Sequence, residues 1–196
     1  MMHILHLDSA ITGDASVSRQ LTADIVARLK SANPDATVTY RDLNEGVPAI
    51  DTAWFQAVRV GIENPTPEQQ AIVATSDALL AEVQAADALV IGLPVYNFSL
   101  PGQLKNWLDQ IARAGISFRY TAEGPEGLLK NKRAFVAYTA AGTPLGSDYD
   151  HASGYLRHML GFLGITDVTF VPADGLAIDR DAGMARAAEA LEQIAA

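Results

Sequence analysis

The stretch Ala88-Leu89-Val90-Ile91-Gly92-Leu93 decides the fold class of this chain of 196 residues. It is a short, nearly continuous apolar run, which is typical of a parallel strand buried on both faces. Residues 66–85, before it, start with Thr-Pro-Glu-Gln: a capping threonine, a proline at the first helical position and a glutamine three residues after the cap. After it, Leu104, Leu108 and Ile111 recur at helical spacing. A buried strand between two helices predicts an α/β protein.

The alternation of strands and helices continues in both directions along the chain. Further strands are predicted at 3–7, 37–43, 133–138 and 166–171, and further helices at 19–30, 148–163 and 179–195. Two connections exceed the ordinary length: residues 44–65, which we expect to be irregular and partly helical, and residues 115–131, which we expect to form a long loop. Because no linker or internal repeat interrupts the pattern, the sequence predicts a single domain over residues 1–196.

Five strands that each precede a helical connection predict a parallel sheet with helices on both faces, a three-layer α/β arrangement. Right-handed crossovers leave few topologies, and the flavodoxin-like strand order 2-1-3-4-5 suits a chain of this length. In that order a ligand binds at the carboxyl ends of strands one and three. The loops that then matter are 8–18, 94–99 and 139–147.

Composition excludes several classes of protein. With 49% hydrophobic and 19% charged residues, the chain has ample material for one core. The formal net charge of −9 repels phosphate backbones, so nucleic acid is not an expected partner. The absence of cysteine removes disulfides, cysteine-ligated zinc, iron–sulfur clusters and thiol nucleophiles. The chain starts without a basic flank, and no stretch approaches the roughly 20 apolar residues that span a bilayer, so we expect a cytoplasmic protein with no membrane partner.

The first loop, residues 8–18, is rich in hydroxyl groups and precedes a helix. It contains neither the dinucleotide motif G-x-G-x-x-G nor the P-loop motif G-x-x-x-x-G-K-[ST]. Free backbone N–H groups and the helix dipole favour an anion at such a helix start, and a monophosphate needs only hydroxyls and amides. The alternative is that Ser16 or Ser18 merely caps the helix.

The second loop carries Tyr96-Asn97-Phe98 directly after the central strand. A flat aromatic ligand can lean on such rings while the asparagine and nearby backbone groups bind its polar edge. The alternative is an aromatic lid on the core. Together, the two loops favour a mononucleotide with a large ring system, and FMN fits that description.

No metal site is expected. His3 and His6 lie three residues apart on a predicted strand and therefore face opposite sides of the sheet. His151 and His158 are two helical turns apart, too far for one ion without other ligands. The G-x-S-x-G motif of serine hydrolases is also missing. The scarcity of catalytic acid–base groups is typical of an enzyme in which a cofactor carries out the chemistry.

An ordered set of short segments points to a family. The segments are Asp8-Ser9, Ser16-Val17-Ser18, Pro94-Val95-Tyr96-Asn97-Phe98, Gln103-Leu104-Lys105-Asn106, Ala112-Arg113-Ala114-Gly115, Phe118-Arg119-Tyr120-Thr121, Gly124-Pro125-Glu126-Gly127-Leu128 and Gly161-Phe162-Leu163-Gly164-Ile165-Thr166-Asp167-Val168. With this set the chain resembles, over essentially its full length, the FMN-dependent NADH azoreductases, also described as NADH:quinone oxidoreductases. These proteins share the flavodoxin-like fold.

The resemblance implies roles for particular residues in holding FMN. Ser9, Ser16 and Ser18 would bind the phosphate, with backbone help from Val17. The segment Pro94, Val95, Tyr96, Asn97 and Phe98 would line the isoalloxazine ring and the ribityl chain. The family has a Ser-Arg-Gly-Gly-like turn after the fourth strand, and this chain has Thr139, Ala140, Ala141 and Gly142 there. The missing arginine points to changed contacts at that turn and to a shifted substrate preference.

The resemblance also implies an activity and an assembly. NADH would give a hydride to FMN, and a quinone or an azo compound would then take two electrons by a ping-pong mechanism. The enzyme would be a homodimer with two flavin sites at the interface. Tyr120, Phe162 and Arg59 match positions of the substrate pocket or its mouth, although loop packing for Tyr120 and core filling for Phe162 are alternatives. NADH is favoured over NADPH, because no basic cluster for an extra phosphate is evident.

A competing function is that of a non-catalytic electron carrier like flavodoxin, which binds FMN and reacts with protein partners. The two long connections at 44–65 and 115–131 favour the enzyme, because a carrier needs no substrate pocket.

Overall fold

The computed structural model describes residues 1–59 and 65–194, and a five-stranded sheet lies at its centre. The strands are β1 (His3–Asp8), β2 (Thr37–Asp42), β3 (Ala88–Pro94), β6 (Arg133–Thr139) and β7 (Asp167–Ala173). They are parallel and follow the spatial order β2-β1-β3-β6-β7. This is the predicted order 2-1-3-4-5, and the numbers differ because two short strands outside the sheet come before β6.

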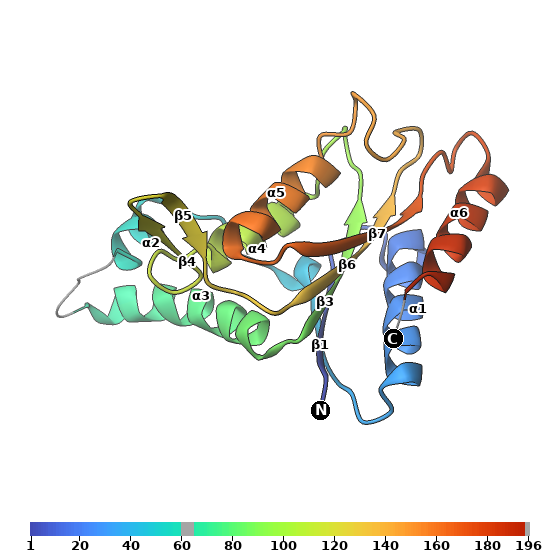
Figure 1. The fold of residues 1–196 in the computed structure, drawn as a ribbon. Coiled ribbons are helices and arrows are strands. Elements are labelled where there is room, and N and C mark those ends of the chain that lie inside the picture. The colour runs from blue at the N-terminus through green and yellow to red at the C-terminus, as the bar shows by residue number, and fades with distance from the viewer. Residues whose placement is uncertain (60–64, 195–196) are drawn as a thin grey trace.

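Helices cover both faces of the sheet (Figure 1). One face carries α1 (Val17–Ala32) and α6 (Arg180–Glu192), and the other carries α3 (Pro67–Ala85), α4 (Gly102–Ile111) and α5 (Ser153–Leu163). Every residue of β3 is buried, as its continuous apolar sequence predicts. The loops after β1, β3 and β6 emerge together at the carboxyl edge of the sheet, the upper edge in Figure 1.

The predicted start of α3 is confirmed in detail. The Thr66 hydroxyl accepts a hydrogen bond from the backbone N–H of Gln69 (3.3 Å). The Gln69 side chain in turn accepts one from the backbone N–H of Thr66 (2.9 Å). This reciprocal pair is a capping box, with proline at the first helical position.

The expected long loop at 115–131 is wrong in part, because most of it forms an antiparallel hairpin of β4 (Phe118–Thr121) and β5 (Gly124–Gly127). Glycine and proline in β5 obscure this strand in the sequence. The hairpin packs backbone to backbone against the end of α5: a Cβ added to Gly127 would lie 2.1 Å from the backbone nitrogen of Gly164.

The stretch 44–65 is partly helical, as expected, whereas the stretch before α5 is longer than the sequence indicates. Within residues 44–65 there is a helix, α2 (Thr52–Ala57), capped by Asp51, and a 3-10 turn, η2 (Leu43–Glu45), precedes it. Residues 60–64 lie outside the described residues. α5 begins at Ser153 and not at 148, since the Asp150 carboxylate accepts hydrogen bonds from the backbone N–H groups of Ala152 (3.0 Å) and Ser153 (2.9 Å) and so fixes the helix start.

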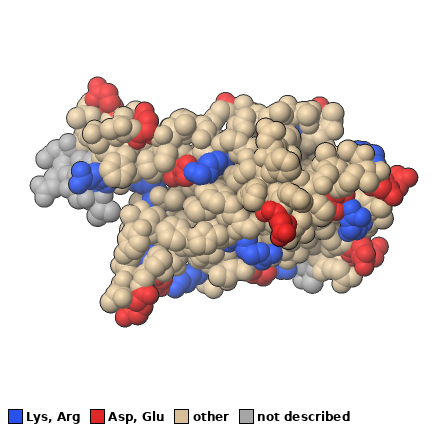
Figure 2. Space-filling model, turned by 90° about the horizontal axis from the view of Figure 1, so that it is seen from above, with Lys and Arg blue, Asp and Glu red and all other residues tan. Residues whose placement is uncertain are grey.

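No helix within residues 1–59 and 65–194 is long and apolar enough to cross a membrane. Seen from above, the molecule shows broad areas without Lys, Arg, Asp or Glu, among which charged side chains are scattered (Figure 2).

Candidate functional site

The loop after β1 presents a pair of hydroxyl groups at the start of α1. Ser16 is the N-cap residue, and its Oγ accepts the backbone N–H of Arg19 at 3.4 Å. The same Oγ lies 2.9 Å from Oγ of Ser18. Ser16 therefore caps the helix, as the alternative interpretation expects. Capping does not use up the pair, because a hydroxyl oxygen has two acceptor sites and a rotatable proton.

The loop after β3 contains a strained two-residue turn. Asn97 and Phe98 have φ angles of 49° and 68°, in the left-handed region that non-glycine residues rarely occupy. Tyr96 and Ser99 close the turn with two backbone hydrogen bonds, of 3.0 and 3.1 Å. The turn exposes 56% of Phe98, so this ring does not act as a lid on the core.

Hydrogen bonds tie this turn to both neighbouring loops. The Tyr96 hydroxyl accepts the backbone N–H of Ile11 in the first loop (3.1 Å). The Phe98 carbonyl accepts the backbone N–H of His151 (3.1 Å), and the backbone N–H of Val95 donates to the Thr139 carbonyl (2.8 Å). The three loops predicted from the topology thus form one connected edge.

A cleft of about 420 Å³ lies between these loops. Among the predicted cofactor residues, those that line it are Ser16, Val17, Pro94, Val95, Tyr96, Thr139, Ala140 and Ala141. Four more lining residues were not predicted: Thr12, Ala15, Leu176 and Ala177. Leu176 and Ala177 follow β7, and their backbone N–H groups donate to the carbonyls of Ala140 (3.1 Å) and Ala141 (2.9 Å). Their place could have been inferred from the topology, because the loop after the last parallel strand begins at the same carboxyl edge of the sheet.

The remaining predicted cofactor residues do not line the cleft. The Ser9 hydroxyl is buried and donates to the Gly92 carbonyl (2.7 Å), where it links β1 to β3. Ser18 is 1% exposed, and its hydroxyl contacts that of Ser16. The loops after β3 and β6 also carry predicted residues that are exposed and do not line the cleft: Asn97, Phe98 and Gly142.

The predicted substrate residues lie elsewhere in this chain. Tyr120 on β4 is 75% exposed, and its ring lies 5.6 Å from that of Phe118, which in turn lies 4.5 Å from that of Phe162 on α5. The hairpin that carries Tyr120 stands at the opposite end of the molecule from α6, away from the upper loops (Figure 1). Arg59 is exposed just after α2. Tyr120 and Phe162 therefore belong to one aromatic cluster, and this cluster does not reach the cleft of its own chain.

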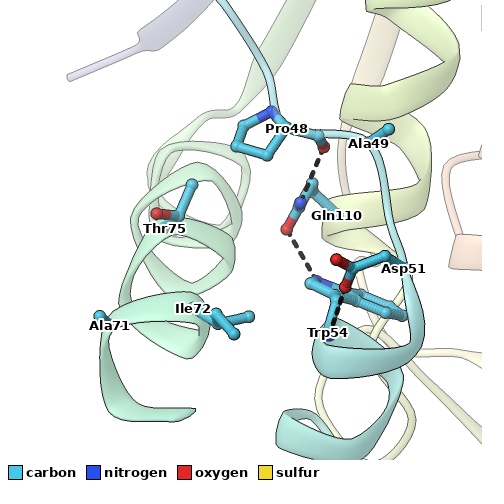
Figure 3. Close-up of a pocket in the computed structure, with 8 residues that line it drawn as sticks. All are labelled: Pro48, Ala49, Asp51, Trp54, Ala71, Ile72, Thr75 and Gln110. Atoms are coloured by element: carbon cyan, nitrogen blue, oxygen red, sulfur yellow. Dashed lines mark hydrogen bonds between the residues drawn. The ribbon is translucent and has the colours of Figure 1, made fainter. Parts of the chain in front are cut away.

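A second cavity, of about 300 Å³, lies between the 48–54 segment, α3 and α4 (Figure 3). The buried Gln110 side chain crosses it, accepting from Nε1 of Trp54 (2.8 Å) and donating to the carbonyl of Pro48 (2.9 Å). The Asp51 carboxylate accepts the backbone N–H of Trp54 (2.8 Å). These hydrogen bonds hold the 48–54 segment, which precedes Arg59, against α4.

No group of three or more His, Cys, Asp or Glu side chains within the described ranges is placed to hold a metal ion. His3 bonds through its ring nitrogens to Thr37 (2.7 Å) and Thr39 (3.1 Å) on β2.

Comparisons with known proteins agree with this geometry. The profile of a family described as flavodoxin-like fold matches residues 2–196. An FMN-dependent NADH:quinone oxidoreductase from Cereibacter sphaeroides (strain KD131) is 56% identical over 196 residues, all of both chains. FMN-dependent NADH:quinone oxidoreductase 1 from Jannaschia sp. (strain CCS1) is 53% identical over the same span.

Solved structures give the same result. An FMN-dependent NADH-azoreductase from Bacillus anthracis str. Ames Ancestor, in complex with FMN, has a TM-score of 0.88 at 29% identity, covering 98% of this chain and 97% of that one. The azoreductase from Bacillus anthracis str. Sterne also has a TM-score of 0.88, at 28% identity, covering 98% of this chain and 96% of that one. The chain therefore belongs to the family of the FMN-dependent NADH:quinone oxidoreductases, within the flavodoxin-like fold.

Proposed function

We propose that this protein is an FMN-dependent oxidoreductase that takes a hydride from NADH and passes two electrons to quinones or to the azo bond of aromatic azo compounds. The observation that carries the proposal is the single cleft that joins the Ser16 hydroxyl at a helix start to the segment from Pro94 to Tyr96. The relatives named above are oxidoreductases, which favours this function over that of a non-catalytic carrier.

The chain's residues fit FMN at both ends of the cleft. The Ser16 hydroxyl, which Ser18 orients, and the first amides of α1, which have no acceptor within the helix, offer the donors that a phosphate requires. The walls formed by Pro94, Val95 and residues 139–141 carry no charged side chain, which suits an uncharged flat ring. When bound, FMN supplies the two-electron chemistry, accepting the hydride of NADH and returning the electron pair to the acceptor.

The residues themselves bind and orient the reactants. The described residues that line the cleft include no Asp, Glu, His, Lys or Arg, so the proton that accompanies the hydride into a quinone is expected to come from solvent. The cleft is open on one side, and NADH and the acceptor both require that side. The two substrates then bind in turn, which is a ping-pong mechanism.

We further propose that a second copy of the chain completes the substrate pocket. Tyr120 is exposed and contacts the half-buried Phe162 through the buried ring of Phe118, remote from the cleft of its own chain. A homodimer would place Tyr120 over the partner's cleft. Light scattering of the purified protein should give the mass of a dimer, and Tyr120→Ala should raise the KM for a quinone while leaving FMN affinity intact.

Two measurements test the activity. Mass spectrometry of the released chromophore should identify FMN. Initial rates against NADH at several quinone concentrations should give parallel lines, and intersecting lines would show a ternary complex instead. A protein that releases FAD, or that cannot be reconstituted with FMN, would overturn the proposal.

The structure refines the test of the phosphate site, because Ser18 is not a helix cap whereas Ser16 is. Ser18→Ala removes the hydroxyl that orients the Ser16 hydroxyl, a neutral hydrogen bond worth roughly 0.5–1.5 kcal/mol, so FMN binding should weaken on the order of two- to tenfold. Its affinity for riboflavin, which has no phosphate, should stay near that of the parent. Thr66→Ala is the matched control: it removes the cap of α3, should cost about 1 kcal/mol of stability, and should leave both affinities unchanged.

A further inference from the structure

A buried carboxylate lies directly beneath the first loop of the cleft. Asp8 ends β1, and its side chain is 4% exposed. Its Oδ1 accepts a hydrogen bond from Oγ1 of Thr22 on α1 (2.8 Å), and its Oδ2 accepts one from the hydroxyl of Tyr40 on β2 (3.1 Å). Nε2 of His6 lies 3.4 Å from the same Oδ2. Burying a carboxylate is costly without such partners, and here they come from three elements around the loop.

Arg19 joins this cluster to the loop itself. Its Nη1 donates to the Tyr40 hydroxyl (2.9 Å), and its Nη2 donates both to Oδ2 of Asp42 (2.6 Å) and to the carbonyl of Ala10 (3.1 Å). The side chain of Asn44 also donates to the Ala10 carbonyl (2.5 Å). Ala10 is thus held in place from two sides.

The connection made by Arg19 spans the whole loop. Arg19 follows Ser18 in the chain, and its backbone N–H donates to the Ser16 hydroxyl. Its guanidinium holds Ala10, at the other end of the loop. One residue therefore fixes both the start of the loop and the hydroxyl pair at its end. The planar, multiply donating guanidinium suits this task, whereas a lysine ammonium would not reach three acceptors in one geometry.

Arg19 also balances charge beneath the loop. The carboxylates of Asp8 and Asp42 both face it, at 3.9 Å from Nη1 and 2.6 Å from Nη2. Without the guanidinium, two negative charges would lie below a loop that is proposed to hold a phosphate dianion, and like charges repel. The Arg19 side chain is 14% exposed and does not line the cleft, so it acts through the loop and not by direct contact.

We propose that Arg19 is a positioning residue for the phosphate of the flavin, which it serves by fixing the 9–18 loop and offsetting Asp8 and Asp42. This inference rests on the proposed function. It predicts discrimination between two ligands that differ only in the phosphate, which a purely structural role of Arg19 would not change.

The test compares dissociation constants for FMN and riboflavin, measured by fluorescence quenching on flavin-free protein. Arg19→Gln should weaken FMN binding about tenfold or more, the equivalent of one charge-assisted contact, and change riboflavin binding less than about threefold. Arg19→Lys retains the charge, so its FMN affinity should fall between those of the parent and of Arg19→Gln. The control is Arg41→Gln on β2, because Arg41 forms a comparable ion pair with Glu82, with Nε at 2.7 Å from Oε2, away from the loop. It should leave the ratio of the two affinities at the parent value.

The outcomes separate this inference from the proposed function. A parent that prefers FMN over riboflavin, with a ratio that Arg19→Gln and Arg19→Lys both leave unchanged, overturns the positioning role alone. A parent with no preference for FMN overturns both proposals. Should Arg19→Gln not fold, Arg19→Lys decides: a parent-like ratio in a protein with a parent-like thermal transition refutes the role.

Discussion

Replacing Phe98 with glycine should give a more stable ligand-free protein than replacing it with alanine, although both variants lose the same ring. The φ angle of Phe98 is 68°, and the ring is 56% exposed, so little packing holds the residue in this conformation. The left-handed region costs a residue with a Cβ about 1–2 kcal/mol relative to glycine. Glycine loses about 0.4–1 kcal/mol of this advantage through the larger entropy of the unfolded chain.

At the middle of these ranges, the difference left between the two variants is about 0.8 kcal/mol in favour of Phe98→Gly, or about 2–3 °C in Tm for a chain of this size. Urea denaturation of the flavin-free proteins measures it directly. If the turn holds strain in order to present the ring, both variants should also bind FMN less tightly than the parent and to a similar degree. An alanine variant as stable as the glycine variant would refute the strain argument.

Asn131 supplies a matched control, because its φ angle of 62° is also positive and it lies outside the cleft. Asn131→Gly should likewise be more stable than Asn131→Ala. Neither change should alter flavin affinity, so a loss of affinity at both positions would point to a general loosening of the fold.

Three further changes test the packing and the titration of the protein. Gln110→Leu leaves the buried indole N–H of Trp54 and a loop carbonyl without partners, so the free energy of unfolding measured in urea should fall by about 2–4 kcal/mol. Gly127→Ala would place a Cβ 2.1 Å from the backbone nitrogen of Gly164, so the free energy of unfolding should fall by about 3 kcal/mol or more. Gly161→Ala in α5 is the control: its added Cβ would have no atom within 4 Å, so this variant should be neutral or stabilising in the same assay. Partial burial, with the negative charge of a neighbouring carboxylate, raises the pKa of Tyr40 from 10.0 to about 12, so its contribution to stability is complete below pH 10 and is lost as the pH rises to 12. An ultraviolet titration of the tyrosinate band should lose its step near pH 12 in Tyr40→Phe, and a step that stays there would contradict this assignment.

The sheet was predictable because its signals are local. The run at 88–93 is apolar throughout, which is the sequence pattern typical of a strand that is buried on both faces. The start of α3 was predictable for the same reason, since Thr66 and Gln69 complete their capping box within one turn. The hairpin at 118–127 was not, because β5 consists of Gly-Pro-Glu-Gly and depends on a close backbone crossing with Gly164 that is distant in sequence.

The location of the cleft was predictable from topology, whereas the orientation of its groups was not. Strand order alone places the loops after β1, β3 and β6 at one edge. It does not indicate that the Ser9 hydroxyl turns inward to the Gly92 carbonyl, or that Phe98 adopts a positive φ angle. Both depend on backbone conformations of single residues, for which a phenylalanine or a serine gives no signal in the sequence.

The cleft and the aromatic cluster depend on separate parts of the chain. The cleft is held by backbone hydrogen bonds between strand ends, such as Val95 to Thr139 and Leu176 to Ala140, which do not require particular side chains. The cluster of Tyr120 and its neighbours is held by the packing of the hairpin on the end of α5. With the proposed roles, cofactor affinity and acceptor preference are therefore encoded in different segments. Substitutions on the hairpin can change which acceptor is reduced without disturbing the loops that hold the flavin.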